Sequence, residues 1–327
     1  MEHANQQKIP PIPSYKEVLQ EIGKNLWYRK KLLAKRTLRI IWPVIVFILL
    51  SFLIITLLFI YESQGKLFES SPLFWQLIIL TGFWLLFAAI YYPIVAWIFS
   101  VERLIWVKSY FDKKNFSPIE SWEQAKSLAR PAFLFMIKIF LRFYLLPISI
   151  WIGIVIFSIA IILSESFTLL MAFIWIVMVI IGILLVPYLY YVRVKHLRFI
   201  WFVFLDSLQN KNFSFKKIMK TNREINQIQK SKVFKQALLL NLGIDTTTAA
   251  IQYLANTIED SLGALAVTLL PPSVSMPMVG VEKSAQMFTE EFISQAAELS
   301  RSVAMYILYQ YVMKFKNNLG DIQNQLE

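Results

Sequence analysis

The sequence predicts an all-α fold: a polytopic helical membrane protein with about six membrane segments in three hairpin repeats and amphipathic helices on the cytoplasmic side. Three observations predict it, namely long apolar stretches without charge, a one-sided distribution of Lys and Arg, and an internal repeat. Hydrophobic residues make up 57% of the chain and charged residues only 17%. That balance is unusually apolar for a water-soluble domain.

Four apolar stretches are long enough to cross a bilayer, whose hydrocarbon core of about 30 Å needs about 20 residues of helix. None contains an acidic or basic side chain, and they comprise residues 40–61, 73–99, 143–163 and 167–192. The polar and basic residues 1–39 lack the apolar core of a cleaved signal peptide. We therefore expect the first stretch to direct the chain into the membrane.

Lys and Arg collect on one side of these stretches. The segments expected outside hold Lys66 and Lys283, and the other 31 of the 33 basic residues lie in 1–40, 100–142, 192–235 and the tail from residue 301. Because such an excess marks the cytoplasmic side, we expect both termini in the cytoplasm. Lys-, Ile- and Asn-rich usage without an organellar transit pattern favours the bacterial cytoplasmic (inner) membrane.

An internal repeat predicts how the chain is organised. Arg103-Leu-Ile-Trp106 followed by Lys114-Asn-Phe-Ser117 recurs, 95 to 97 residues later, as Arg198-Phe-Ile-Trp201 followed by Lys211-Asn-Phe-Ser214. We predict three units: residues 1–106 with a basic helix and the first hairpin, 107–201 with the second of each, and 202–327 with a third helix and a modified, polar hairpin.

Capping boxes predict where two cytoplasmic helices begin. In Ser14-Tyr-Lys-Glu17 and Ser117-Pro-Ile-Glu120, the Ser hydroxyl can accept from a free backbone N–H while the Glu reaches back to the Ser N–H. Pro118 suits the first helical position, where its missing donor is not needed. The third copy, which starts at Ser214, lacks the Glu.

The N-terminal helix is amphipathic and basic, which is typical of a helix that lies on a membrane surface. We expect its cationic side chains to contact anionic lipid head groups, and these are Lys24, Arg29, Lys30, Lys31, Lys35, Arg36 and Arg39. The bilayer explains the net charge of +12 better than nucleic acid does, because no basic soluble domain is present. The later basic run Arg193, Lys195, His196 and Arg198 indicates a solvated face.

The third unit carries a polar stripe in place of an apolar span. Its members recur at helical spacing and form one face: Asn241, Asp245, Thr248, Gln252, Asn256 and Glu259. If this helix crosses the membrane, the stripe must face protein or water. Asp245 would then be the carboxylate in the central part of a span, where ionisable groups are functional candidates.

A segment rich in proline follows the stripe. Residues 262–281 carry no charge, and Pro271, Pro272 and Pro277 are expected to break a helix, which favours a turning or re-entrant segment. Three alternatives are open for the third unit. It can be a hairpin packed through its polar face, a water-filled path, or a helical domain outside the bilayer.

No signature of catalysis, metal binding or cofactor binding occurs in the sequence. Cysteine is absent, and two distant histidines, His3 and His196, do not make a usual zinc site. No glycine-rich phosphate loop is present. The adjacent carboxylates Glu259-Asp260 and Glu290-Glu291 point in different helical directions. We therefore predict neither an enzyme nor a bound metal or cofactor.

Residues 100–235 resemble a known family. Units of the form Lys-Asn-Phe-Ser, short amphipathic helix, basic residues and apolar hairpin are similar to the multi-pass membrane domain that precedes the catalytic part of some bacterial glycerophosphodiester phosphodiesterases, and to related stand-alone membrane proteins. The resemblance implies a helical membrane domain. Because the catalytic domain is absent, it implies no phosphodiesterase activity and transfers no functional residue.

Two functions are compatible with this sequence. The first is a non-enzymatic scaffold or subunit of a membrane complex that assembles through its third hairpin, as a homo-oligomer or with a partner membrane protein. The alternative is a channel or transporter with a polar path along Asn241, Asp245 and Gln252.

Overall fold

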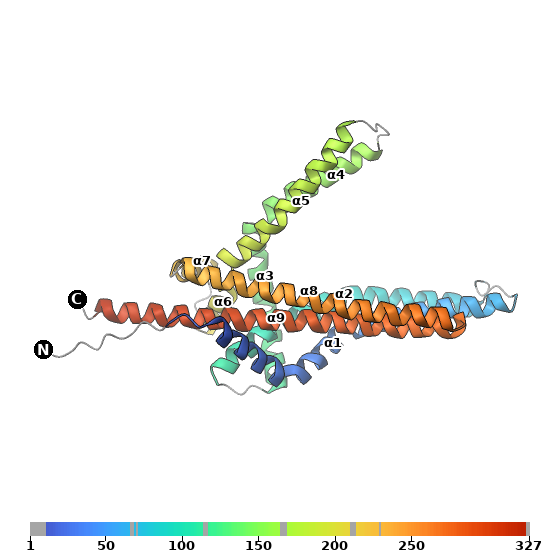
Figure 1. Ribbon diagram of the computed structural model, residues 1–327, viewed down its shortest axis with the longest axis horizontal. Coiled ribbons are helices and arrows are strands. Elements are labelled where there is room, and N and C mark those ends of the chain that lie inside the picture. Colours follow the sequence, from blue (N-terminus) through green and yellow to red (C-terminus); the bar gives the residue numbers. More distant parts are fainter. Residues whose placement is uncertain are drawn as a thin grey trace. The chain divides into compact units, whose positions relative to one another are not determined.

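The computed structural model describes residues 11–65, 69, 71–113, 117–163, 169–209, 214–228 and 230–324. Within these ranges the regular elements are α-helices and no strand occurs, which confirms the all-α prediction. Their order is α1 (Tyr15–Ser63), α2 (Pro72–Phe111), α3 (Pro118–Phe143), α4 (Leu145–Leu163), α5 (Leu169–His196), α6 (Ile200–Gln209), α7 (Phe215–Gln227), α8 (Lys230–Leu269) and α9 (Pro272–Asn324) (Figure 1).

Several helices are long and apolar enough to cross a membrane. Among the described residues these are α1, α2 and the part of α5 from Val179 to His196, with α3 and the start of α4 as a fourth if that bent pair is one span. The third apolar stretch, residues 143–163, is helical as α4 from Leu145 on, and α4 meets α3 at a bend of 63° that was not predicted. Pro147 lacks the N–H that would bond to the carbonyl of Phe143, so the helix is interrupted there.

The described chain forms two compact units, each built from separate stretches of sequence. Unit 1 comprises Met1–Ser14, Ser127–Leu238 and Met305–Glu327, and unit 2 comprises Tyr15–Lys126 and Leu239–Ala304. The division into three sequence repeats is a different one and stays a prediction.

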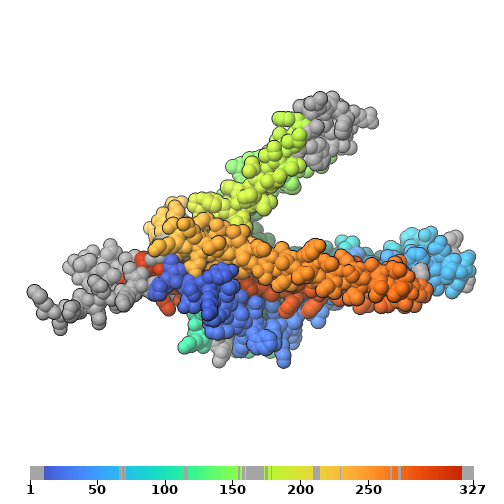
Figure 2. All heavy atoms as spheres, in the orientation of Figure 1, coloured from blue at the N-terminus to red at the C-terminus, as the bar shows by residue number. Residues whose placement is uncertain are grey.

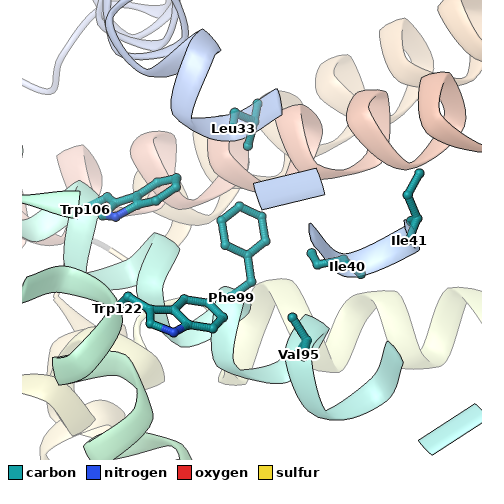
Figure 3. Close-up of a cluster of buried hydrophobic side chains, with 7 residues drawn as sticks. All are labelled: Leu33, Ile40, Ile41, Val95, Phe99, Trp106 and Trp122. Carbon is teal, nitrogen blue, oxygen red and sulfur yellow. The ribbon is translucent and has the colours of Figure 1, made fainter. Parts of the chain in front are cut away.

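In unit 2, α1, α2 and the start of α3 share a hydrophobic core. Phe99 and Trp106 of α2 meet edge to face with ring centroids 5.3 Å apart. Figure 3 shows Leu33, Ile40, Ile41, Val95 and Trp122 around this pair, all of them buried. Met287, Phe288, Phe292 and Ala296 of α9 pack against the cluster. This core therefore joins helices from both ends of the chain.

The third hairpin consists of two long helices in place of a broken segment. Residues 262–269 continue α8, and α9 starts at Pro272, so the interruption is confined to Leu270 and Pro271. The predicted break occurs at Pro271 and Pro272, where the chain turns from α8 into α9, but the prediction that Pro277 breaks the helix was wrong. Pro272 occupies the first helical position, where its missing donor is tolerated, and Pro277 lies inside the second turn of α9. In unit 2 the hairpin arms lie side by side (Figure 1).

Unit 1 has an aromatic core around Phe135 of α3. Its ring stacks on Phe204 of α6 at 4.7 Å and meets Phe215 of α7 edge to face at 5.5 Å. Tyr306 of α9 packs on Phe202 at 4.9 Å. The hydroxyl of Tyr309 donates to Asp206 of α6 at 2.5 Å. Burial and the neighbouring carboxylate raise the pKa of Tyr309, so this phenol stays protonated and donates.

The helix starts follow the caps. Glu120 N–H donates to the Ser117 hydroxyl at 3.2 Å, and Ser117 N–H donates to the Glu120 carboxylate at 2.8 Å, which confirms the predicted capping box. Ser214 precedes α7, but its side chain makes no cap hydrogen bond, as the missing Glu leads us to expect.

Candidate functional site

The polar stripe of α8 faces the interior of unit 2. Asn241 is buried, and Asp245, Thr248, Gln252, Asn256 and Glu259 are half-buried. The opposite side of the helix is apolar and exposed, with Leu254, Ile258 and Leu262 each about 60% exposed. In Figure 2 the orange surface of α8 lies uncovered on the face shown. The helix therefore turns this polar stripe inward and exposes a row of large apolar side chains, unlike a helix on the surface of a water-soluble protein.

Asp245 forms an ion pair in this interior. Arg301 of α9 donates to its carboxylate and also to Glu298 one turn earlier. The side chains of Asp245 and Arg301 are 34% and 14% exposed. Thr248 donates to the carbonyl of Ile244 on its own helix at 2.7 Å. The structure thus brings Asp245 to α9 but not to a shared cluster with Gln252.

Contacts within unit 2 align α9 with the first two apolar stretches. Gly280 lies directly against Phe52, near the middle of the first stretch, and a Cβ at residue 280 would come 2.9 Å from the Phe52 Cβ. Further along α9, Glu291 accepts from the Tyr92 hydroxyl at 3.0 Å. Gln295 accepts from Arg103, which lies four residues beyond the end of the second stretch at Phe99. Residues 280–291 of α9 are therefore level with the apolar stretches.

This alignment changes the expected position of Asp245. Its partner Arg301 follows Gln295 by six residues, which is about 9 Å of helix. Asp245 thus lies beyond the ends of the apolar stretches of α1 and α2, and not at their middle. Gly243 supports this position, because it contacts the hydroxyl of Tyr15 at the start of α1.

A different ion pair is level with the apolar stretches. Lys283 of α9, three residues from Gly280, donates to Asp260 of α8 at 2.9 Å and lies 3.7 Å from Glu282. Lys283 thus lies within the helix α9 and not in a loop, and its side of the membrane stays a prediction. Lys283 and Asp260 lie on either side of the charge-free residues 262–281. Because a hairpin brings the two ends of such a segment together, these positions were the sequence signal for the ion pair.

The seven cations expected to contact lipid head groups divide into two classes. Lys24, Lys30, Lys31, Lys35 and Arg39 are exposed. Arg29 is half-buried and donates to the carbonyl of Trp106 at 3.2 Å. Arg36 is buried, so its assignment to lipid was wrong. It donates to Glu102 at 2.9 Å and to the carbonyl of Pro118 at 2.8 Å.

A basic cavity that was not predicted from the sequence lies in unit 1. Its volume is about 1400 Å³, and it lies between the ends of α3 and α5, the link after α5, the helix α7 and the start of α8. The described residues that line it include eight Lys or Arg side chains and His196 but no Asp or Glu. On α7 the cations Lys216, Lys220 and Arg223 share one face.

Hydrogen bonds fix the wall of this cavity. The side-chain amides of Asn222 and Asn226 both donate to the carbonyl of His196 at the end of α5, at 2.7 and 3.3 Å. Arg198 in the following link donates through Nη2 to the carbonyl of Asn226 at 3.2 Å. These bonds hold the end of α5 against α7.

Arg198 is buried in that wall and incompletely paired. Only 7% of the residue is exposed, and its Nε and Nη1 atoms are buried without a hydrogen-bond partner. Burial lowers the pKa of Arg198 to about 10, so it remains charged at neutral pH. The expectation of a solvated face was wrong for this residue. The sequence signal for this cavity was the group of eleven Lys and Arg residues within 192–235. That group had been attributed only to the excess of basic residues on the cytoplasmic side.

Comparison of the chain with protein-family models, with curated proteins and with solved structures finds no match. The resemblance of residues 100–235 to a phosphodiesterase-associated membrane domain therefore stays a prediction.

Proposed function

We propose that the protein is a non-enzymatic membrane scaffold, or a subunit of a membrane complex, that assembles with further copies through its third hairpin. The observation that carries the proposal is the reversed polarity of α8, whose outward face is apolar. Leu254, Ile258, Leu262, Leu265 and Leu269 follow one another at spacings of three or four residues and are all more than half exposed. Such a stripe is stable in a bilayer or against another helix, and not in water.

Ion pairs between α8 and α9 support a structural role for the charged residues of the hairpin. Asp245 is neutralised by Arg301, and Asp260 is neutralised by Lys283, so the charges of the hairpin pair with one another. Of these two pairs, Asp260 with Lys283 is level with the apolar stretches, where ionisable groups are expected to pair with one another. This pairing favours the scaffold over the polar path through Asn241, Asp245 and Gln252.

Small residues of α9 do not provide the assembly surface. Ala297, Ser300 and Ala304 are all buried within the chain. Their small size lets α9 approach its neighbours closely inside the protein. Assembly is therefore assigned to the exposed stripe of α8.

Cysteine labelling tests whether the third hairpin crosses the membrane. The native chain has no cysteine, so Thr268→Cys, next to the turn between α8 and α9, would be the single reactive position. We expect a membrane-impermeant maleimide to label it in intact cells, as it labels Gln64→Cys. Lys126→Cys on the cytoplasmic helix α3 should react only after lysis. Labelling of Thr268→Cys only after lysis would contradict a crossing hairpin.

Alanine substitution tests the assembly stripe. Leu254→Ala with Leu262→Ala should shift the purified protein toward the monomer by light scattering in mild detergent. The matched control is Ile79→Ala with Leu86→Ala, which removes apolar side chains that are at least as exposed from α2. A wild-type monomer, or equal effects of both pairs, would contradict assembly through α8. Ion flux in liposomes that falls with Asp245→Asn while assembly persists would favour the channel instead.

A further inference from the structure

The internal repeat shows that Arg198 lacks a partner that its counterpart has. Arg103 and Arg198 occupy the same repeat position, and each is 7% exposed. In unit 2, Nη1 of Arg103 donates to the side chain of Gln295, and Nη2 donates to Ser100 at 3.1 Å. In unit 1, Nη1 of Arg198 is buried without a partner, and Arg198 is one of the residues that line the cavity. A buried guanidinium N–H group without a partner is unfavourable unless a ligand accepts from it.

The charge of the cavity defines what that ligand must be. Lys195, Lys216, Lys220, Arg223 and Lys230 line the same space as Arg198, and no carboxylate accompanies them among the described lining residues. Cations gathered in one concave site repel one another and attract an anion from solution. Arginine donates in a planar fork that fits phosphate oxygens. The site is therefore complementary to phosphate.

The place of the cavity in the fold connects it to the membrane surface. Arg142 and Phe143 are the last residues of α3, just before the apolar helix α4. Tyr191, Lys195 and His196 are in the last turns of α5, where its apolar stretch ends. The cavity thus lies where two apolar helices become polar, which is the depth of lipid phosphates. Basic pockets at this depth bind phospholipid head groups that carry more than one charge.

We propose that this cavity binds an anion bearing two or more phosphate groups, with Arg198 donating to one phosphate through its unpaired N–H groups and Lys220 and Arg223 contacting another. The volume of about 1400 Å³ exceeds what a single phosphate fills. Tyr191 and Phe234, whose rings meet edge to face at 6.3 Å, provide an apolar wall that suits the first carbons of the acyl chains of a lipid. The site does not depend on the scaffold role proposed above.

Binding is tested on the full chain in nanodiscs of phosphatidylcholine, with two probes. Inorganic pyrophosphate represents a soluble ligand and is measured by calorimetry. Cardiolipin, a lipid with two phosphates, is added to the nanodiscs, and the lipid retained by the protein is measured by native mass spectrometry. If cardiolipin is retained and pyrophosphate does not bind, the ligand is a phospholipid. If pyrophosphate alone binds, the ligand is a soluble anion with two phosphate groups. Failure of both probes overturns the proposal.

Variants separate the cavity from general attraction to a basic protein. Arg198→Gln should weaken binding of whichever probe the wild type binds by about tenfold or more, because it removes charge-assisted hydrogen bonds to phosphate. Lys220→Gln with Arg223→Gln changes two exposed side chains, so folding is retained and binding should fall to a similar degree. The matched control, Lys30→Gln with Lys31→Gln, removes the same charge from exposed positions of α1. An equal loss with the control pair overturns the proposal.

A stability measurement distinguishes a missing ligand contact from a damaged fold. Without the probe, Arg198→Gln loses the bond to the Asn226 carbonyl but also a buried charge, so its melting temperature in the empty site serves as its own reference. With the probe, wild type should melt at a higher temperature and Arg198→Gln should not. A rise of the same size in both proteins would show that Arg198 does not contact the anion.

Discussion

At the residue scale, the buried pair of Arg36 and Glu102 shows that a cation of the basic N-terminal helix stabilises the fold and does not contact lipid. Glu102 is fully buried and accepts from Arg36 at 2.9 Å and from the Ser121 hydroxyl at 2.8 Å. The indole of Trp106 donates to the same hydroxyl at 3.1 Å. Arg36 also stacks over the ring of Trp122 at 4.5 Å. The pair therefore ties α1, α2 and α3 of unit 2 together.

Removal of one partner should destabilise unit 2 strongly. Arg36→Met leaves the Glu102 carboxylate buried without its counter-charge, which is expected to lower the free energy of unfolding by about 3–5 kcal/mol. Replacing both residues, Arg36→Met with Glu102→Leu, should recover much of that loss. The measurement is denaturant unfolding in mild detergent, followed by tryptophan fluorescence.

An exposed ion pair provides the control for this prediction. Lys126 and Glu123 lie 2.8 Å apart, but their side chains are 46% and 61% exposed. Lys126→Met should change the free energy of unfolding by less than about 1 kcal/mol, because exposed pairs are screened by water. If Arg36→Met has as small an effect as Lys126→Met, the buried pair is not structural.

At the scale of the element, the start of α3 depends on the capping box. Ser117→Ala removes the acceptor for the N–H of Glu120, which is expected to weaken the first turn by about 1 kcal/mol. Amide hydrogen exchange at Glu120 should then be faster by about fivefold. Ser214→Ala is the control, since the Ser214 side chain makes no cap hydrogen bond and exchange in α7 should not change. Unchanged exchange at Glu120 would contradict the cap.

The elements also show how far local pattern predicts structure. The start of α3 and the helical identity of the apolar stretches depend on neighbouring residues, and both were predicted from them. The bend between α3 and α4 was not predicted. Pro43 lies inside the continuous helix α1, whereas Pro147, its counterpart in the repeat, follows a break. The same residue type thus gives two outcomes, which the pattern of neighbouring residues does not distinguish.

At the scale of the whole molecule, charge asymmetry predicts the topology. Reporter fusions after Gln64 and Asn210 should lie on opposite sides of the membrane, with Asn210 in the cytoplasm, because residues 192–235 are rich in Lys and Arg. An active cytoplasmic reporter such as green fluorescent protein at Asn210 and an active periplasmic phosphatase at Gln64 are the expected pair. The same side for both fusions would contradict the arrangement of the first four apolar stretches.

The sequence by itself determined the all-α class and the helices apolar enough to cross a membrane. These properties depend on composition over about 20 consecutive residues, and they do not depend on distant parts of the chain. The start of α3 was determined in the same way, by Ser117 and Glu120 three residues apart.

Only the tertiary structure decided which charged side chains are buried and what they contact. Arg36 and Lys35 are neighbours in a basic run, yet one pairs with Glu102, 66 residues away, and the other is exposed. Asp245 is paired with Arg301 beyond the apolar stretches, and Arg198 faces a cavity shared by four helices and a link. Burial and pairing depend on which distant residues meet in three dimensions, and helical periodicity carries no information about that.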